Sequence, residues 1–287
     1  MPTGLVAAVF ILPSFLPMLL FTIGPMAASM VLSFYKWDLL RPARWVGIDN
    51  YQSLAADPEF HAAVEHTLFF ISGYMPLVFV GGLAIALALN QQLRGGGAFR
   101  TIYFLPVVTS WVVVAFIWKW LLNPQTGVVN FALGLVGIHG PGWWTDPNWA
   151  MPSIILASAW KDLGFVMVIL LAGLKAIPDE YYDAARVDGA GTWARFWRIT
   201  LPLLSPAIFF VVVISLINGF QVFDQVFVMT GGGPAGASSV VVLDIVTHAF
   251  RYGQVGYASA MSWILFAAIL GVTLVQLGIQ KRWVVYS

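Results

Sequence analysis

Residues 179–206 read DEYYDAARVDGAGTWARFWRITLPLLSP, a charged stretch that lies between two long apolar runs. The whole chain is 60% hydrophobic and only 9% charged, with a mean hydropathy of +0.84. Soluble domains are about 45–50% apolar. The composition therefore predicts an integral membrane protein, in which this stretch is a polar loop between membrane spans.

The apolar runs have the length of helical spans. A helix needs about 20 apolar residues to cross a bilayer, so a barrel of short alternating strands fits poorly. The first run is interpreted as a bent span and not as a signal peptide, because no basic segment precedes it and it contains Pro13, Pro17 and Pro25. The sequence predicts an all-α polytopic protein with spans at residues 5–35, 67–90, 101–122, 151–174, 203–229 and 256–280.

The distribution of Lys and Arg predicts the orientation, because cytoplasmic loops carry an excess of both residues. With the N-terminus inside, eight lie in the cytoplasm: Arg94, Arg100, Lys175, Arg186, Arg195, Arg198, Lys281 and Arg282. Four lie outside: Lys36, Arg41, Arg44 and Arg251. Lys119 and Lys161 fall within spans. Both termini and the loop 175–202 are therefore predicted to be cytoplasmic.

Several classes of chemistry find no support in the sequence. A net charge of +1 gives no indication of nucleic-acid binding, and the absence of cysteine removes disulfides, thiolate metal sites and cysteine nucleophiles. The four histidines, at 61, 66, 139 and 248, have no carboxylate at metal-ligand spacing. No phosphate-binding motif G-x-x-x-x-G-K-[ST] is present. We therefore expect no catalytic residue, metal or cofactor in this chain.

Local signals divide the loop into two short helices. Pro178 followed by Asp179 is typical of a helix start, and Gly189 and Gly191 interrupt the first helix. Thr192 is the expected N-cap of the second helix, and Pro202 is expected to end it where the next span begins.

The two helices carry exposed aromatic and small residues. The first places Tyr182, Ala185 and Gly189 on one side, and the second presents Trp193, Phe196 and Trp197. Aromatic and arginine side chains are common anchors of protein interfaces, which favours a docking surface. A helix that lies on lipid headgroups has the same composition. Composition does not separate these interpretations.

The order of residues in the loop resembles the EAA loop of ABC importer permeases. The matching positions are Asp183, Ala184, Ala185, Gly189, Ile199, Leu201 and Pro202. Asp183 departs from the usual Glu by one methylene. The segments FDQVFVMTGGGPAGASS and YASAMSWILF are also similar to the end of the fifth span, the outer turn and the sixth span of such permeases. The resemblance covers nearly the whole chain, and the A-type permeases of glycerol-3-phosphate or glycerophosphodiester uptake look most similar.

This resemblance implies a single permease domain over residues 1–287, in a bacterial inner membrane, that imports a sugar or glycerol-phosphate solute. The implied partners are a second permease subunit, two ATPase subunits that bind ATP and Mg, and an extracytoplasmic solute-binding protein. The EAA loop would contact the ATPase and carry its closure to the spans.

Polar residues in the fifth span are candidates for the solute path. Ser215, Asn218, Gln221 and Gln225 fall within an arc of about 120° on a helix, with Asp224 at its margin. Interhelical hydrogen bonding is the alternative. The family's sugar site on this helix favours the solute path.

Lys161 and its neighbour Asp162 lie near the middle of the fourth span, where charges are expensive. A structural ion pair with another helix and a solute contact both explain them, and Lys161 would suit a phosphate. Lys119, near a span end, is expected to snorkel.

Three further interpretations remain open. Glu59 and Glu65 flank an external segment that could contact a binding protein. A secondary transporter or channel would not need the EAA loop. An intramembrane enzyme acting on lipid or glycan would need clustered acids and bases at membrane depth.

Overall fold

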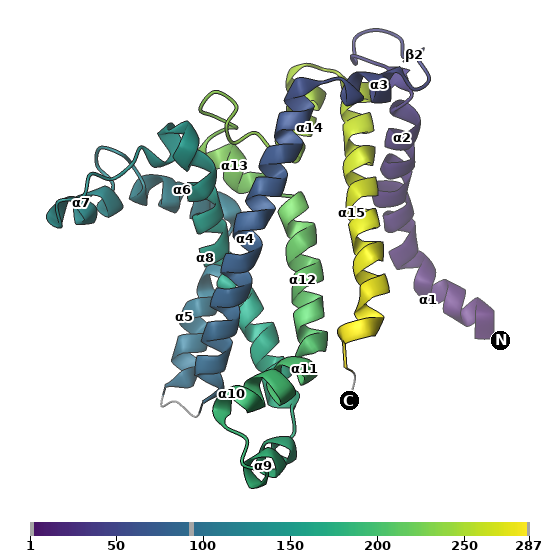
Figure 1. The fold of residues 1–287 in the computed structure, drawn as a ribbon. Coiled ribbons are helices and arrows are strands. Elements are labelled where there is room, and N and C mark those ends of the chain that lie inside the picture. The colour runs from purple at the N-terminus through teal and green to yellow at the C-terminus, as the bar shows by residue number, and fades with distance from the viewer. Residues whose placement is uncertain (1–2, 92–94, 286–287) are drawn as a thin grey trace. The chain divides into compact units, whose positions relative to one another are not determined.

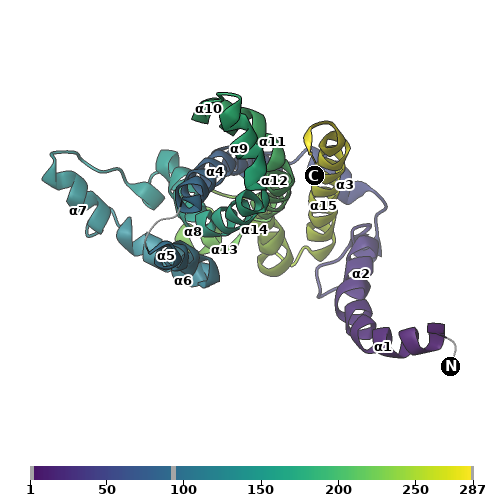
Figure 2. The same ribbon diagram turned by 90° about the horizontal axis from the view of Figure 1, so that it is seen from below.

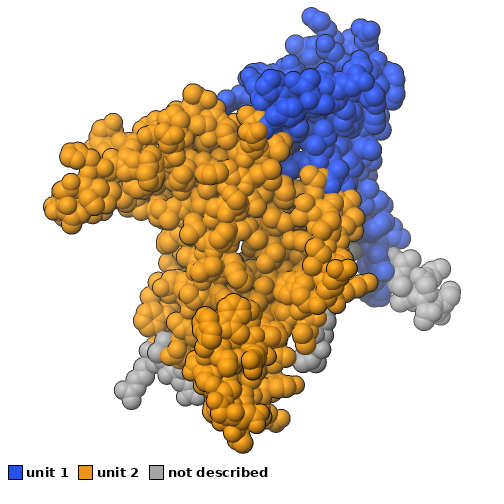
Figure 3. Space-filling view, viewed as in Figure 1, with its two compact units in different colours: residues 1–61, 244–267 blue, residues 62–243, 268–287 orange. Residues whose placement is uncertain are grey.

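The computed structural model describes residues 3–91 and 95–285. The regular secondary structure of the described part is helical apart from two antiparallel two-residue strands, β1 (Tyr35–Lys36) and β2 (Arg44–Trp45). The chain divides into two compact units, residues 1–61 with 244–267 and residues 62–243 with 268–287 (Figure 3). The prediction of an all-α fold is confirmed, whereas the single permease domain stays a prediction.

The first unit begins with one continuous helical run (Figure 1). Its elements are α1 (Thr3–Met18), η1 (Leu19–Ile23), α2 (Gly24–Leu32), α3 (Asp49–Ala55), η4 (Thr247–Arg251) and the start of α15 (Val255–Trp283). Trp263 on α15 donates a hydrogen bond to the Ser29 hydroxyl on α2 at 3.2 Å. Gly256 lies so close to α2 and β1 that a Cβ there would be 1.8 Å from the Tyr35 carbonyl oxygen.

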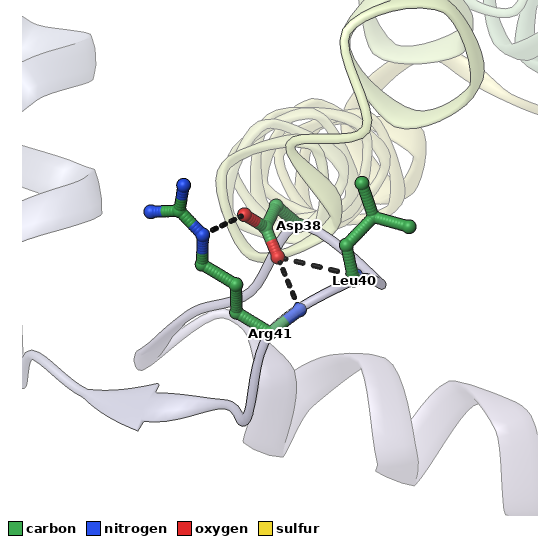
Figure 4. A network of polar contacts seen from close by, with 3 residues as sticks. All are labelled: Asp38, Leu40 and Arg41. Atoms are coloured by element: carbon green, nitrogen blue, oxygen red, sulfur yellow. Dashed lines mark hydrogen bonds and ion pairs between the residues drawn. The ribbon is translucent and has the colours of Figure 1, made fainter.

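The loop between β1 and β2 is held by Asp38 (Figure 4). One carboxylate oxygen accepts hydrogen bonds from the backbone N–H groups of Leu40 and Arg41 at 3.2 and 2.8 Å, and the other lies 3.7 Å from the Arg41 guanidinium. The backbone hydrogen bond from Arg41 lowers the pKa of Asp38 below its ordinary value. This loop therefore has a local polar anchor.

The second unit contains the remaining helices. They are α4 (Pro58–Asn90), which begins at the unit boundary, α5 (Gly96–Val108), α6 (Trp111–Leu121), α7 (Val128–Leu135), η2 (Trp143–Thr145), α8 (Pro147–Ala176), α9 (Asp179–Val187), α10 (Thr192–Arg195), η3 (Phe196–Thr200), α11 (Leu201–Leu203), α12 (Ser205–Phe220) and α13 (Asp224–Met229). Helix α14 (Val241–Val246) lies at its boundary with the first unit.

Helix α8 is the centre of this unit, with α4, α5 and α12 packed against it (Figure 2). Most of its apolar window is buried. Close approach depends on glycines, because a Cβ at Gly82 of α4 would lie 2.5 Å from Val166, and one at Gly164 would lie 2.0 Å from the Tyr103 carbonyl oxygen. The absent side chains let the backbones meet.

Four helical segments among the described residues are long and apolar enough to cross a membrane. They are Phe15–Leu32, Pro58–Asn90, Pro147–Ala176 and Val255–Trp283. Two bent pairs, α5 with α6 and Thr192–Leu203 with α12, raise the number to six if each pair is one span. The first bend lies within the predicted span 101–122, and the second lies at the start of the predicted span 203–229.

The third predicted span is broken between α5 and α6, which meet at 101°. Pro106 lacks an N–H, so it cannot continue the hydrogen-bond ladder of α5. Thr109 and Ser110 then take extended backbone conformations with ψ of 140°. The last carbonyl groups of α5 are therefore left without intrahelical partners.

The fifth predicted span is interrupted after Phe220, and residues 221–223 separate α12 from α13. Gly219 is a weak helix former near the end of α12, and Asp224 is a favourable first residue for α13. Asn218 and Gln225 consequently lie on two different helices.

The second predicted span begins earlier than expected, at Pro58 and not at residue 67. The Asp57 carboxylate accepts hydrogen bonds from the backbone N–H groups of Glu59 and Phe60 at 2.9 and 3.5 Å, as an N-cap does. Glu59 and Glu65 therefore belong to the first turns of α4.

Candidate functional site

The polar loop folds as two short helices joined at Gly189. Gly189 has a φ of +75°. The Gly189 N–H bonds the Arg186 carbonyl at 3.1 Å, and the Ala190 N–H bonds the Ala185 carbonyl at 2.8 Å, which is a Schellman motif. The predicted helix, turn and helix is confirmed, and the turn depends on a left-handed residue.

Two details of the second helix correct the sequence interpretation. Gly191 is the N-cap, and Thr192 is the first helical residue with no capping hydrogen bond from its side chain. Pro202 does not end the helix, which continues to Leu203. The π turn η3 allows this, because its wider ring bonds the Leu201 N–H to the Phe196 carbonyl just before the proline.

The surface of this loop is aromatic and exposed. Trp193, Phe196 and Trp197 pack on one another with ring centroids 5.5–6.2 Å apart, yet Trp193 is 73% exposed and Trp197 is 50% exposed. The Tyr182 and Thr200 hydroxyl groups share a hydrogen bond of 3.1 Å that links the two helices. The loop is therefore braced internally while its aromatic face is uncovered.

Asp183, the first position of the EAA-like pattern, forms an exposed ion pair of 2.7 Å with Arg186 one turn later. Ala184 beside it is exposed, whereas Ile199, Leu201 and Pro202 are half-buried. The positions that match the EAA pattern therefore lie partly on the exposed surface of the first short helix and partly where the second short helix joins the next span.

A polar cavity of about 360 Å³ lies at the break between α12 and α13. Its lining residues come from five helices and the break: Phe70, Tyr74, Trp111, Asp162, Asn218, Gln221, Val222, Phe223, Asp224 and Gln225. The Tyr74 hydroxyl donates a hydrogen bond to the Asp162 carboxylate at 2.8 Å, and the Gln225 amide donates one to Ser158 at 3.3 Å. The cavity therefore combines carboxylates, amides and aromatic rings.

Four of the predicted path residues, Asn218, Gln221, Asp224 and Gln225, line this cavity. They do so because the chain breaks after α12, and not because they share one helical face as predicted. Ser215 is buried and is not among the lining residues.

Lys161 is also absent from the lining. Its ammonium group donates a hydrogen bond of 3.1 Å to the Val107 carbonyl at the end of α5 and lies 4.7 Å from the centre of the Trp111 ring. A helix C-terminus carries a partial negative charge that favours a cation. Lys161 thus pairs with a backbone carbonyl that the break between α5 and α6 leaves without an intrahelical partner. The sequence suggested an ion pair or a solute contact.

The cavity contains residues that the sequence analysis did not select. Tyr74 and Phe70 lie on α4, and Trp111 begins α6. Tyr74 interrupts the run FFISGYMPLVF, and a phenol hydroxyl in an apolar span was the available signal. Nothing in the sequence placed Trp111 beside the fifth span.

Lys119, His66 and His248 each have a partner within the protein. Lys119 donates a hydrogen bond of 3.4 Å to the Val228 carbonyl and lies over the Trp144 ring, so its ammonium contacts protein where snorkelling was expected. His66 bonds the Ser239 carbonyl, and His248 bonds the Gln254 side chain. Within residues 3–91 and 95–285 no three His, Asp or Glu side chains are grouped to hold a metal.

Helices long enough to cross a membrane, a polar cavity at a broken span and a polar loop with an exposed aromatic face are the features of a transport permease. The chain belongs to the family of binding-protein-dependent transport system inner membrane components, which it matches over residues 79–284. It is accordingly a multi-pass inner membrane permease of an ABC importer and a non-catalytic subunit, which works with another permease, an ATPase and a solute-binding protein.

Relatives and solved structures agree with this assignment. The probable ABC transporter permease YesP of Bacillus subtilis is 36% identical over 97% of this chain and 91% of its own length. The trehalose/maltose permease MalF of Thermococcus litoralis is 34% identical over 94% and 92%. A bacterial alginate ABC transporter in complex with an alginate-bound periplasmic protein matches with a TM-score of 0.86 and 26% identity, over 96% of this chain and 94% of that one.

Proposed function

We propose that this permease imports a neutral, hydroxylated sugar, which passes through the cavity at the α12–α13 break. The observation that carries the proposal is the lining of that cavity. Its amides, Asn218, Gln221 and Gln225, each offer a donor and an acceptor to hydroxyl groups. Its aromatic rings, among them Trp111, offer flat apolar faces to a sugar ring.

The charges of the cavity favour a neutral solute over glycerol phosphate. Asp162 and Asp224 line it, and no Lys or Arg does so among the described residues. An anionic solute would meet two carboxylates in a poorly screened environment. The names of several relatives, including a lactose permease of Rhizobium radiobacter, support a sugar as the solute.

The cavity supplies only part of a site. Asn218, Gln221 and Asp224 are exposed in the isolated chain, so a second, different permease subunit supplies the facing wall. Two ATPase subunits, which bind ATP and Mg, complete the membrane complex. The solute-binding protein delivers the sugar from outside, and the early acids Glu59 and Glu65 are candidates to contact it.

The loop 175–202 couples the ATPase to the spans. Its EAA-like positions Asp183, Ala184, Ala185, Gly189, Ile199, Leu201 and Pro202 are the proposed coupling residues. Both termini and this loop lie in the cytoplasm, as the Lys and Arg distribution favours. Arg94, counted in that distribution, lies outside the described residues.

The test is uptake by the reconstituted importer. Asn218→Ala or Gln221→Ala should lower sugar uptake about tenfold, because one lost hydrogen bond to a solute is worth about 1.4 kcal/mol. Assembly with the ATPase should not change. Gln52→Ala, an exposed amide of α3, is the matched control. Unchanged uptake in both cavity variants would leave the polar residues as helix packing and move the site to the partner permease.

A further inference from the structure

A second polar cavity, of about 470 Å³, lies at the loop end of the spans. It is enclosed by the end of α4, the first turn of α5 and the segment that joins α8 to α9. Neither the transport path nor the coupling residues account for it. Its lining includes two cations, Arg100 and Lys175, and one carboxylate, Asp179.

The two cations have no partners within the described residues. Neither Arg100 nor Lys175 forms an ion pair there, since the described ion pairs join Asp38 to Arg41 and Asp183 to Arg186. The Arg100 Nε atom is buried and makes no hydrogen bond. A buried charged donor without an acceptor is unfavourable, so this side chain is suited to an anionic ligand.

The start of α5 adds donors to the same cavity. The N-cap Gly95 provides no side-chain cap, and the first turn contains no acidic residue. The third and fourth residues bond back to the Gly95 carbonyl, whereas the N–H groups of Gly96 and Gly97 make no such bond within the described residues. A Cβ at Gly96 or Gly97 would meet nothing within 4 Å, so the space above these amides is open. Free amides at a helix N-terminus favour anions.

These donors line the same cavity, and their chemistry suits a phosphate group. Arg100 lies four residues after Gly96 and therefore on the same face of α5. Its planar guanidinium can bind two phosphate oxygens, and Lys175 supplies a point charge from α8. The Asn90 and Gln91 side chains add neutral donors. Among the described lining residues the two cations exceed the single carboxylate, so this lining is net positive.

We infer that this cavity binds the phosphate of an anionic phospholipid from the cytoplasmic leaflet. Exposed apolar side chains continue along α5 from the cavity, among them Phe99, Ile102 and Leu105. They offer an acyl chain an apolar surface that begins beside the phosphate donors. Basic pockets at the cytoplasmic ends of spans are suited to lipid headgroups. The inference uses the membrane orientation proposed above, but it does not depend on the identity of the sugar.

The site can be tested by lipid titration of the purified importer complex in detergent, followed by native mass spectrometry. Phosphatidylglycerol should bind the wild type, and Arg100→Gln or Lys175→Gln should weaken its binding about tenfold. Arg100→Lys, which keeps the charge, should weaken it less. Lys281→Gln removes a cation from the same side of the membrane but outside the cavity, and it should bind like the wild type.

Two outcomes would overturn the inference. Equal phosphatidylglycerol binding by the wild type and the Arg100→Gln/Lys175→Gln double variant would show that this cavity does not bind the lipid. Displacement of the lipid by inorganic phosphate would assign the cavity to a free anion. Because lipid binding is measured without transport, a failure here is distinguishable from a failure of the sugar path, which the uptake of the Asn218 and Gln221 variants tests.

Discussion

Among single residues, Gly189 determines the shape of the loop 175–202, for which we propose the coupling role. Its φ of +75° is unfavourable for residues with a Cβ, although no neighbouring atom would obstruct one. Gly189→Val should therefore destabilise the turn by about 1–2 kcal/mol and misplace the second helix. We expect loss of solute-stimulated ATP hydrolysis in the reconstituted complex. Gly189→Asn should retain activity, because Asn tolerates this conformation, and normal stimulation in Gly189→Val would contradict the prediction.

Asp57 makes the stability of the first unit depend on pH. Burial alone would raise the pKa of Asp57, but hydrogen bonds from the Tyr257 hydroxyl and from the backbone of Glu59 and Phe60 leave it below its ordinary value of 3.8. A depressed folded-state pKa contributes stability that is present above pH 3.8 and is lost as the pH falls through the lower value. The Tm difference between wild type and Asp57→Asn should therefore be present at neutral pH and shrink in acid. A difference that is independent of pH would show that the carboxylate charge does not matter.

At the level of the elements, the two breaks in the spans determine which polar groups contact one another inside the second unit. The α5–α6 break frees the carbonyl that holds Lys161, and the α12–α13 break gathers the cavity residues. Breaks of this kind are tolerated at membrane depth where neighbouring groups satisfy the backbone. The packing of α5 on α8 keeps the first break in place.

A substitution at Gly164 tests the packing of α5 on α8. A Cβ at this position would lie 2.0 Å from the Tyr103 carbonyl oxygen, a backbone atom that cannot rotate away. Gly164→Ala should therefore destabilise the protein by about 1–3 kcal/mol, as overpacking does, and lower the Tm of the purified complex. Gly134→Ala in α7 is the control, since nothing lies within 4 Å of the added Cβ. An unchanged Tm in Gly164→Ala would mean that α5 moves away without loss.

At the scale of the whole molecule, the orientation can be tested on a background without cysteine. Trp193→Cys places a thiol on the exposed face of the coupling loop, and Thr126→Cys places one in the loop 123–150. An impermeant maleimide added to intact cells should label the second variant and not the first. Labelling of the Trp193→Cys variant from outside would reverse the proposed topology.

The class of protein, the approximate spans and the two short helices of loop 175–202 could all be predicted from the sequence. Hydropathy and residue order are local properties, so the helical spans, the turn at Gly189 and the family could all be predicted from neighbouring residues. Asn218, Gln221, Asp224 and Gln225 were found because polar residues in apolar runs are conspicuous.

The positions of the breaks in the spans and the partners of the charged side chains depend on how the whole chain folds. A proline indicates a weak point in a helix, but the 101° bend at Thr109 depends on what accepts the freed backbone groups. Lys161 pairs with a carbonyl 54 residues away, and Asp162 with a tyrosine 88 residues away. Such long-range partners are set by how the helices pack around α8, which periodicity within one span does not encode.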